Sequence, residues 1–417
     1  MNKSIIGLQW GDEGKGKIVD FLSKQFDLVV RYQGGNNAGH TVIVDDVTYK
    51  LNLIPSGAIR GKSCFLGQGV ILDPEHFINE LNSFKRKIPN PVIYLSSNIS
   101  LILDYHKKLD KINESILIGE SKIGTTAKGI GPAYQDKIGR KSIKLHDLGN
   151  EKNIEDKLHN IKEFYDPILL KFGEEPVNIQ ANKSFLSKVY EDISGLIVDN
   201  NFINENFNNK NILFEGAQGA LLDLDHGSYP FVTSSNTIST YIPIGSSINS
   251  SFETLGIFKA YATRVGNGPF PTELNNSIGN YMAEKGFEYG TVTKRKRRCG
   301  WLDLVSLKYS CKINNVKELC ITKVDVLNEL DQIKICKSYE GKLFNEINFS
   351  DSSILDKLKL NEEDFVIFEK WGDLSFLKSM EDMPLQLKKF INFIEDYLEI
   401  PINIISFGPD RKETIVK

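Results

Sequence analysis

The sequence predicts an α/β fold with a large, mostly parallel central sheet flanked by helices. Short apolar runs recur along the chain, and polar or glycine-rich segments follow them, which is typical of strands buried in a sheet. These runs are 4–8, 28–32, 92–95, 211–214, 255–260, 319–322 and 402–406. Segments with helical periodicity lie between several of them, at 16–24, 75–87, 104–113, 151–164 and 386–398. Such alternation predicts parallel strands connected by helices.

The domain organisation follows from the length and from one polar stretch. Large α/β enzymes often elaborate a single sheet, so we expect one catalytic domain over 1–417 with a helical elaboration at roughly 100–210. Within it, 150–210 has helical periodicity, and Pro167 and Pro176 are expected to interrupt the helices. The asparagine-rich segment 201–211 is expected to be a surface loop.

Charge and cysteine content exclude several classes of protein. Lys and Arg number 51 against 54 Asp and Glu, a net charge of -3, so no overall positive field favours nucleic acid or a membrane surface. The five cysteines are widely spaced without a CxxC pair, which argues against a disulfide framework or zinc site and favours a reducing cytoplasm. No apolar run is long enough to span a bilayer. We therefore expect a cytoplasmic protein whose anion sites are local.

A glycine-rich loop follows the first predicted strand. Gly11, Gly16 and Lys17 match the Walker A pattern except at its end, where Ile18 replaces the hydroxyl residue that binds Mg²⁺. Glycines let backbone N–H groups face phosphate oxygens, and the next helix adds its positive end. Asp12 lies inside this loop, where an unused carboxylate would repel phosphate, so we expect it to bind a metal, accept a substrate proton, or both. The loop predicts a P-loop NTPase-like phosphate site that is also a catalytic centre, with a plain strand-to-helix turn as the alternative.

A second glycine-rich loop, QGGNNAGHT at 33–41, follows the second predicted strand. Its glycines and asparagines leave little apolar surface for a structural histidine. The composition favours His40 as a catalytic or phosphate-contacting group.

Both loops resemble those of adenylosuccinate synthetases. The similarity continues at 123–137, 215–237, 263–273 and 297–303, and in the segments TKVDVL and FGPDR, so it spans nearly the whole chain. That family uses GTP to join L-aspartate to inosine monophosphate (IMP) through a 6-phosphoryl-IMP intermediate, the first committed step from IMP to AMP.

The resemblance implies a set of site residues. The catalytic groups are Asp12, as the base for the N1 proton of IMP, with His40, Lys15 and Gln218. The GTP contacts are Gly11, Asp12, Glu13, Gly14, Lys15, Gly16, Lys17, Gly39, His40, Thr41, Arg297, Lys323, Val324, Asp325, Ser406, Phe407 and Gly408. The IMP contacts are Asp12, Lys15, Asn37, Ala38, Gly39, His40, Thr126, Arg140, Gln218, Thr233 and Arg295. Aspartate is expected at Thr291, Val292, Thr293, Arg295 and Arg297, and one Mg²⁺ per subunit at Asp12 and the Gly39 carbonyl. Arg140 is implied to reach the IMP of a neighbouring subunit, which implies a homodimer.

Some of these assignments have a physical argument of their own. Thr322 to Asp325 resembles the guanine motif of GTPases, whose aspartate accepts hydrogen bonds from groups that adenine lacks. The basic run 294–298 is better suited to small carboxylates than to nucleic acid, because no aromatic residues alternate with it. The chain departs from the family pattern at Val292, Lys294 and Phe407, so aspartate and guanine recognition are open to change there.

Two other functions remain as alternatives. A guanine-nucleotide switch would keep the Mg²⁺-binding hydroxyl and would not need Asp12. A family member that binds nucleotide without turnover would lack a catalytic group, but every candidate is present.

Overall fold

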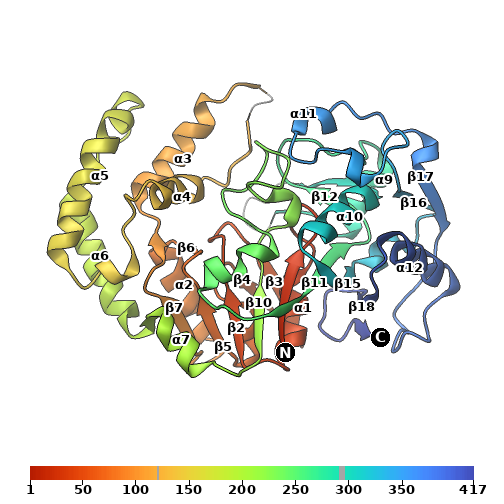
Figure 1. Ribbon diagram of the computed structural model, residues 1–417, viewed down its shortest axis with the longest axis horizontal. Helices are drawn as coiled ribbons and strands as arrows, with labels where there is room; N and C mark the ends of the chain where they lie inside the picture. The colour runs from red at the N-terminus through yellow and green to blue at the C-terminus, as the bar shows by residue number, and fades with distance from the viewer. Residues whose placement is uncertain (120–121, 291–295) are drawn as a thin grey trace.

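A ten-stranded sheet forms the centre of the protein in a computed structural model that describes residues 1–119, 122–290 and 296–417 (Figure 1). In spatial order its strands are β19 (Thr414–Val416), β18 (Ile402–Ser406), β15 (Val316–Thr322), β11 (Phe252–Lys259), β1 (Asn2–Gly7), β10 (Ile212–Glu215), β2 (Leu28–Arg31), β5 (Ser63–Leu66), β7 (Ile93–Ser96) and β9 (Ile197–Val198). Neighbouring strands are parallel except β18 and β19. The predicted fold class is confirmed.

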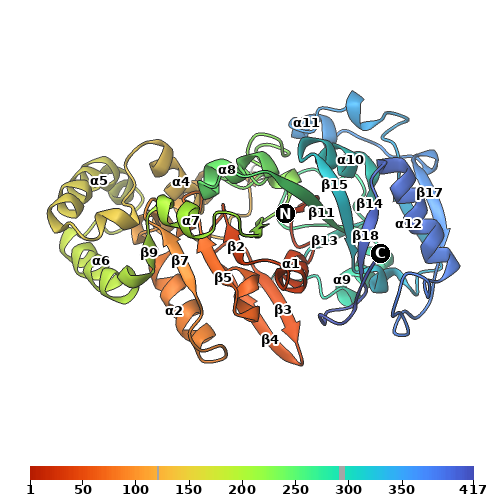
Figure 2. The same cartoon turned by 60° about the horizontal axis from the view of Figure 1, so that its bottom comes forward.

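Helices cover both faces of this sheet (Figure 2). Successive side chains of a strand point to opposite faces, so Ile5 packs into one core and Ile6 into the other. The first core contains α1 (Lys15–Ser23) and α2 (Pro74–Lys85), and the second contains α10 (Leu304–Ile313) and α12 (Leu385–Leu398). Burial on both faces explains why the strands are continuous apolar runs.

A helical region lies beside the β7 end of the sheet (Figure 1). It contains α3 (Asp104–Ile116), α4 (Ile130–Ile138), α5 (Glu151–Lys171), α6 (Ile179–Ile193) and α7 (Asn200–Asn206). The expectation that Pro167 interrupts a helix is wrong, because α5 continues through it. Pro167 lacks the N–H group that would donate to the Glu163 carbonyl in a helix. Both residues are exposed, so water can hydrate that carbonyl. The expected loop at 201–211 is also partly wrong, since α7 covers its first half and Asp199 caps that helix.

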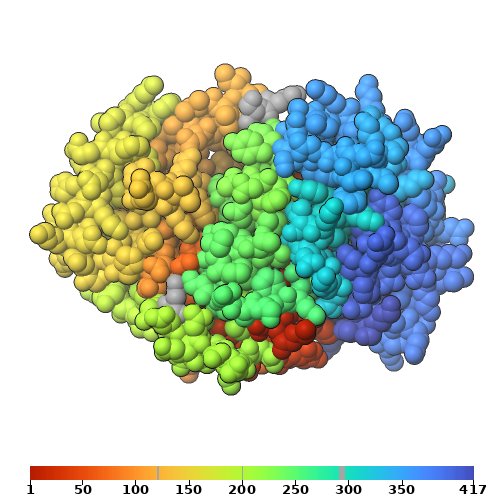
Figure 3. Space-filling model, viewed as in Figure 1, coloured from red at the N-terminus to blue at the C-terminus, as the bar shows by residue number. Residues whose placement is uncertain are grey.

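Smaller elements complete the structure. They are β3 (His40–Val44), β4 (Val47–Leu51), β6 (Ile71–Leu72), β8 (Ser100–Leu101), α8 (Ile242–Ser246), β12 (Ala262–Arg264), α9 (Ser277–Lys285), β13 (Arg298–Gly300), β14 (Leu302–Asp303), β16 (Gln332–Cys336), α11 (Ser352–Leu355) and β17 (Phe365–Glu369). In the space-filling view, the segment around β10 and α8 fills the middle of one face, between the helical region and the C-terminal part (Figure 3). Within the described ranges, no helix has both the length and the apolarity to cross a bilayer.

The order of the sheet gathers the predicted ligand loops. Strands β18, β15, β11, β1, β10 and β2 are consecutive neighbours and run in the same direction. Their carboxyl ends therefore meet at one edge, where ligands bind in open α/β sheets. The phosphate loop leaves β1 in the middle, with the predicted guanine segments on one side and the predicted IMP segments on the other.

Candidate active site

The phosphate loop is shaped by a carboxylate inside it. Glu13 is fully buried, and its Oε1 accepts hydrogen bonds from the backbone N–H groups of Gln9 and Gly11 at 3.1 and 2.9 Å. Its Oε2 lies 2.5 Å from Lys15 Nζ. A Cβ at Gly219 would lie 2.5 Å from Glu13 Oε1, so the loop after β10 approaches only because that residue is glycine. The side chain of Glu13 thus holds the loop together, and its contact with GTP stays a prediction.

Asp12 has a left-handed backbone, with φ of 61°, between Gly11 and Glu13. Its side chain is 30% exposed, and Asp12 Oδ2 lies 2.8 Å from Arg297 Nε. The predicted base and a predicted aspartate-binding arginine are thus in contact. Because this arginine belongs to a distant segment, the sequence alone could not pair the two.

His40 packs directly against the phosphate loop. A Cβ at Gly16 would lie 2.8 Å from His40 Cβ, so a larger residue at position 16 would displace the imidazole. His40 Nδ1 lies 2.5 Å from Glu215 Oε1, and both side chains are buried. Glu215 also accepts hydrogen bonds from the Ser56 hydroxyl and backbone N–H, at 2.9 and 2.8 Å.

This buried pair determines the ionisation of His40. Burial lowers the pKa of the His40 imidazole, and the Glu215 carboxylate opposes that effect. Because Nδ1 faces Glu215, the Nε2 edge is the one left to meet a ligand. Sequence reasoning missed Glu215, although an acidic residue that ends a buried strand beside a glycine-rich loop was a usable signal.

Gln218 lies on the other side of the phosphate loop. A Cβ at Gly11 would lie 3.7 Å from the Gln218 Cα, and Gln218 has a φ of 56°. Its side-chain oxygen is buried without a hydrogen-bond partner among the described residues. Nearby, the side-chain nitrogen of Asn37 donates to the Thr233 hydroxyl at 3.5 Å, so two predicted IMP residues meet.

The predicted guanine loop contacts the phosphate loop through Thr322. The Thr322 hydroxyl donates to the Glu13 carbonyl at 2.7 Å. Three residues later, Asp325 Oδ1 is buried without a partner among the described residues, and burial raises the pKa of this carboxyl. A buried acceptor that lacks a donor matches the need to receive guanine N–H groups.

Lys17 connects the phosphate loop to the last strand. Its Nζ donates to the Ser406 hydroxyl at 2.8 Å and to the carbonyls of Gly408 and Glu413 at 2.7 and 2.9 Å. Burial lowers the pKa of Lys17 to about 8. In this arrangement Lys17 braces the segment predicted to flank guanine; its contact with phosphate stays a prediction.

Several predicted residues are not joined to this cluster. Thr126 and Arg140 are exposed, and Arg140 forms no ion pair with any described residue. Thr41 is exposed on β3, whereas Ala38, Val324 and Phe407 are buried. Thr291, Val292, Thr293, Lys294 and Arg295 lie outside the described residues.

The predicted Mg²⁺ site has only two ligands from the protein, Asp12 and the Gly39 carbonyl. No group of three or more His, Cys, Asp or Glu side chains in the described ranges has metal-binding geometry. Mg²⁺ commonly takes only one or two carboxylates and obtains its other oxygens from phosphates and water. A single partly exposed carboxylate at Asp12 fits that donor set.

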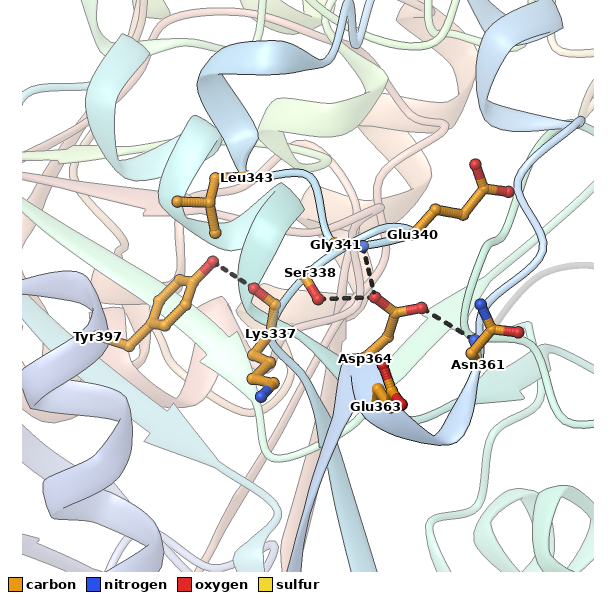
Figure 4. A pocket seen from close by; sticks show the side chains of 9 residues that line it. All are labelled: Lys337, Ser338, Glu340, Gly341, Leu343, Asn361, Glu363, Asp364 and Tyr397. Carbon is orange, nitrogen blue, oxygen red and sulfur yellow. Dashed lines mark hydrogen bonds between the residues drawn. The ribbon is translucent and has the colours of Figure 1, made fainter.

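A separate pocket of about 590 Å³ is lined by the segment after β16, the segment before β17 and Tyr397 of α12 (Figure 4). Its buried carboxylate, Asp364, accepts hydrogen bonds from the Ser338 hydroxyl and from the N–H groups of Gly341 and Asn361. This carboxylate is therefore satisfied within the protein, and the pocket contains none of the predicted site residues.

The fold and site define a class of protein: an enzyme that binds nucleotide phosphates at a P-loop-like turn and carries a carboxylate for chemistry inside that turn. The sequence profile of the adenylosuccinate synthetase family matches residues 4–415. The chain belongs to this family.

Individual relatives agree with the family match. The chain is 44% identical to an adenylosuccinate synthetase of Wolbachia sp. subsp. Brugia malayi, with 99% of this chain and 96% of the relative covered. It is 42% identical to that of Chromohalobacter salexigens, with 100% and 98% covered. The structure of fully ligated adenylosuccinate synthetase from Plasmodium falciparum superposes with a TM-score of 0.92 at 38% identity, covering 100% of this chain and 99% of that one.

Family membership fixes the overall reaction. The chain is a ligase of purine biosynthesis that joins L-aspartate to IMP at the expense of GTP. IMP, GTP and aspartate are its substrates.

Proposed function

We propose that the two chemical steps of this ligation share the site around Asp12, with 6-phosphoryl-IMP between them. Asp12 accepts the N1 proton of IMP, and the 6-oxygen then attacks the γ-phosphorus of GTP, with GDP as the leaving group. The aspartate amine attacks C6 next and displaces phosphate. The observation that carries this proposal is a partly exposed carboxylate inside a phosphate loop against which His40 and Gln218 pack, at Gly16 and Gly11. General-base catalysis of this kind contributes roughly 10² to 10⁴ in rate.

His40 donates a hydrogen bond from Nε2 to the transferring phosphoryl group. Donation from Nε2 requires a protonated imidazole, because Nδ1–H already faces Glu215. The carboxylate and the incoming phosphoryl oxygens both favour that charged form. Lys15 offsets charge on the same oxygens, and the open side-chain oxygen of Gln218 meets the base of IMP.

Asp12 and the Gly39 carbonyl would hold one Mg²⁺ per subunit, together with nucleotide oxygens. When bound, the ion supplies positive charge that stabilises the phosphates during transfer. Lys323, Val324 and Asp325 face guanine from one side, and Ser406, Phe407 and Gly408 from the other.

Aspartate binds through Arg297 and through Thr291, Val292, Thr293 and Arg295. Planar guanidinium groups suit carboxylates because they donate two parallel hydrogen bonds. The burial of Arg297 beside Asp12 supports an aspartate position next to the reacting purine.

The enzyme acts as a cytoplasmic homodimer, each subunit a single catalytic domain. Arg140 lends its guanidinium to the IMP 5'-phosphate of the neighbouring subunit. The exposed, left-handed position of Arg140 just after α4 supports this role, because no described carboxylate in its own subunit engages it.

The test is a reaction of purified protein with GTP, Mg²⁺, IMP and aspartate, followed by phosphate release and purine absorbance. All three substrates are expected to be required. Phosphate release that is indifferent to aspartate and IMP would instead support a guanine-nucleotide switch.

A further inference from the structure

Glu288 is a buried carboxylate to which none of the roles above is assigned. It lies three residues after the end of α9, is fully buried, and contacts charged groups from three other segments. Its Oε1 lies 3.2 Å from Lys259 Nζ and 2.8 Å from Lys323 Nζ, and its Oε2 lies 2.7 Å from Arg297 Nη1. The Tyr261 hydroxyl also donates to Oε1, at 2.6 Å.

The charges around Glu288 are closest to balance when it is ionised, with three cations against two carboxylates. Three cations surround it, and Asp12 is the other carboxylate in contact with Arg297. Although burial opposes ionisation, Lys259, Lys323 and Arg297 hold the pKa of Glu288 well below its usual range. A neutral side chain here would leave the cations with Asp12 as their one remaining anion in this cluster.

Glu288 also fixes the position of Arg297 through the backbone. The Glu288 N–H donates to the Ala283 carbonyl at 2.8 Å, which anchors it to α9, and the Arg297 N–H donates to the Glu288 carbonyl at 2.9 Å. The guanidinium of Arg297 is then shared, with Nη1 on Glu288 and Nε beside Asp12. Backbone and side chain together aim Arg297 at the phosphate loop.

On its other side Glu288 holds the predicted guanine loop. Lys323 has a left-handed φ of 57°, and its Nζ donates to Glu288 Oε1 and to the Gly286 carbonyl at 2.5 Å. Asp325, whose Oδ1 has no hydrogen-bond partner in the described part of the chain, follows two residues later. One carboxylate therefore contacts both the loop that would recognise guanine and the arginine that would bind aspartate.

We propose that Glu288 is a positioning residue that couples guanine recognition to aspartate binding, by holding Lys323 and Arg297 in one buried ion cluster. This inference rests on the roles proposed above for Arg297 and for the Lys323 to Asp325 loop. A nucleotide base that orders Lys323 also orders Glu288, and hence Arg297. By thermodynamic linkage, aspartate tightens GTP binding by the same factor.

The first test is Glu288→Gln, which keeps the side-chain shape and removes the charge. We expect the KM for aspartate and the KM for GTP each to rise at least tenfold, while the KM for IMP changes less than threefold. The control is Glu284→Gln, which removes an exposed carboxylate one helical turn earlier and should leave all three KM values unchanged. An equal fall in kcat without a split among the KM values would mean that Glu288 only supports the fold, and would overturn the proposal.

Two further measurements keep the test decisive if Glu288→Gln does not fold. Glu288→Asp retains the charge but is one methylene shorter, so it should restore the melting temperature without restoring the KM for aspartate. In the unmodified enzyme, a non-hydrolysable GTP analogue should tighten aspartate binding at least fivefold in calorimetry; independent binding would refute the coupling. If the unmodified enzyme shows no turnover that depends on aspartate, the proposed function is refuted. That result differs from independent binding of GTP and aspartate, which refutes only the coupling.

Discussion

Replacement of Glu215 by glutamine tests whether this carboxylate keeps the His40 imidazole protonated. The carboxylate lies 2.5 Å from His40 Nδ1, and both groups are buried, so little solvent screens their interaction. A hydrogen bond between charged groups contributes about 1.5 to 3 kcal/mol, and the glutamine amide keeps the shape of the side chain but not its charge. Since burial already lowers the pKa of His40, the loss of Glu215 lowers it further.

The expected result is a change in the pH dependence of turnover. If protonated His40 is the active form, activity falls as pH rises through the pKa of His40, and in Glu215→Gln this fall occurs at lower pH. At about 1.4 kcal/mol per tenfold change, the loss of this interaction lowers kcat at neutral pH by about 10 to 10²-fold. The assay is the initial rate of phosphate release at saturating substrates, from pH 5.5 to 9.

A matched control separates charge from packing. Ser56→Ala removes the hydroxyl that donates to Glu215 Oε1 but keeps the carboxylate, so it should lower kcat less than tenfold and leave the pH profile in place. A Glu215→Gln enzyme with kcat within twofold of the unmodified protein and an unmoved alkaline limb would refute the argument that Glu215 sustains the charge on His40.

Three other substitutions test the remaining roles. Asp12→Asn should reduce turnover at least 10²-fold without lowering the melting temperature, because it removes the base but keeps the shape of the loop; activity within tenfold of normal would exclude Asp12 as the base. Asp325→Ala should reduce the preference for GTP over ATP in kcat/KM at least tenfold, because adenine lacks the N–H groups that this carboxylate would accept. An unchanged ratio would show that Asp325 does not recognise guanine. Arg140→Leu should raise the KM for IMP at least tenfold while sedimentation still reports a dimer, whereas Arg86→Leu, which replaces another exposed arginine, should leave both the KM for IMP and the dimer unchanged. A monomeric unmodified enzyme with normal turnover would exclude a site shared between subunits.

The sequence predicted the parts of the fold that depend on local patterns. Apolar runs marked β1, β2, β7, β10, β11, β15 and β18, because strands buried on both faces have little choice of residue. β5 (Ser63–Leu66) was missed, because its apolar run is only Cys64 to Leu66 and its pairing with β2 and β7 is a property of the sheet rather than of its own residues. α5 was cut short at Pro167, because the pattern does not reveal that the affected carbonyl faces water.

The residues of the candidate site likewise fall into those that a local pattern predicted and those that only the fold shows. Sequence analysis found Gly11 to Lys17 and His40, because the glycines and polar residues of a phosphate-binding turn are neighbours in sequence. The partners of these groups could not: Glu215 is far from His40 in sequence, and Arg297 is far from Asp12. Buried ion pairs join segments that only the folded sheet brings together, so they can be identified only from the tertiary structure.

The interleaved strand order also constrains how the protein is made. β1, which carries the phosphate loop, is flanked by β10 and β11, so its second neighbour is complete only once about 260 residues have left the ribosome. Until then the edge of β1 that faces β11 is open to other chains, and before β10 is made the edge of β2 that faces it is open as well; closure must draw together segments that are far apart in sequence. A ribosome that stalls in the first half of this message therefore releases an aggregation-prone fragment without a nucleotide site.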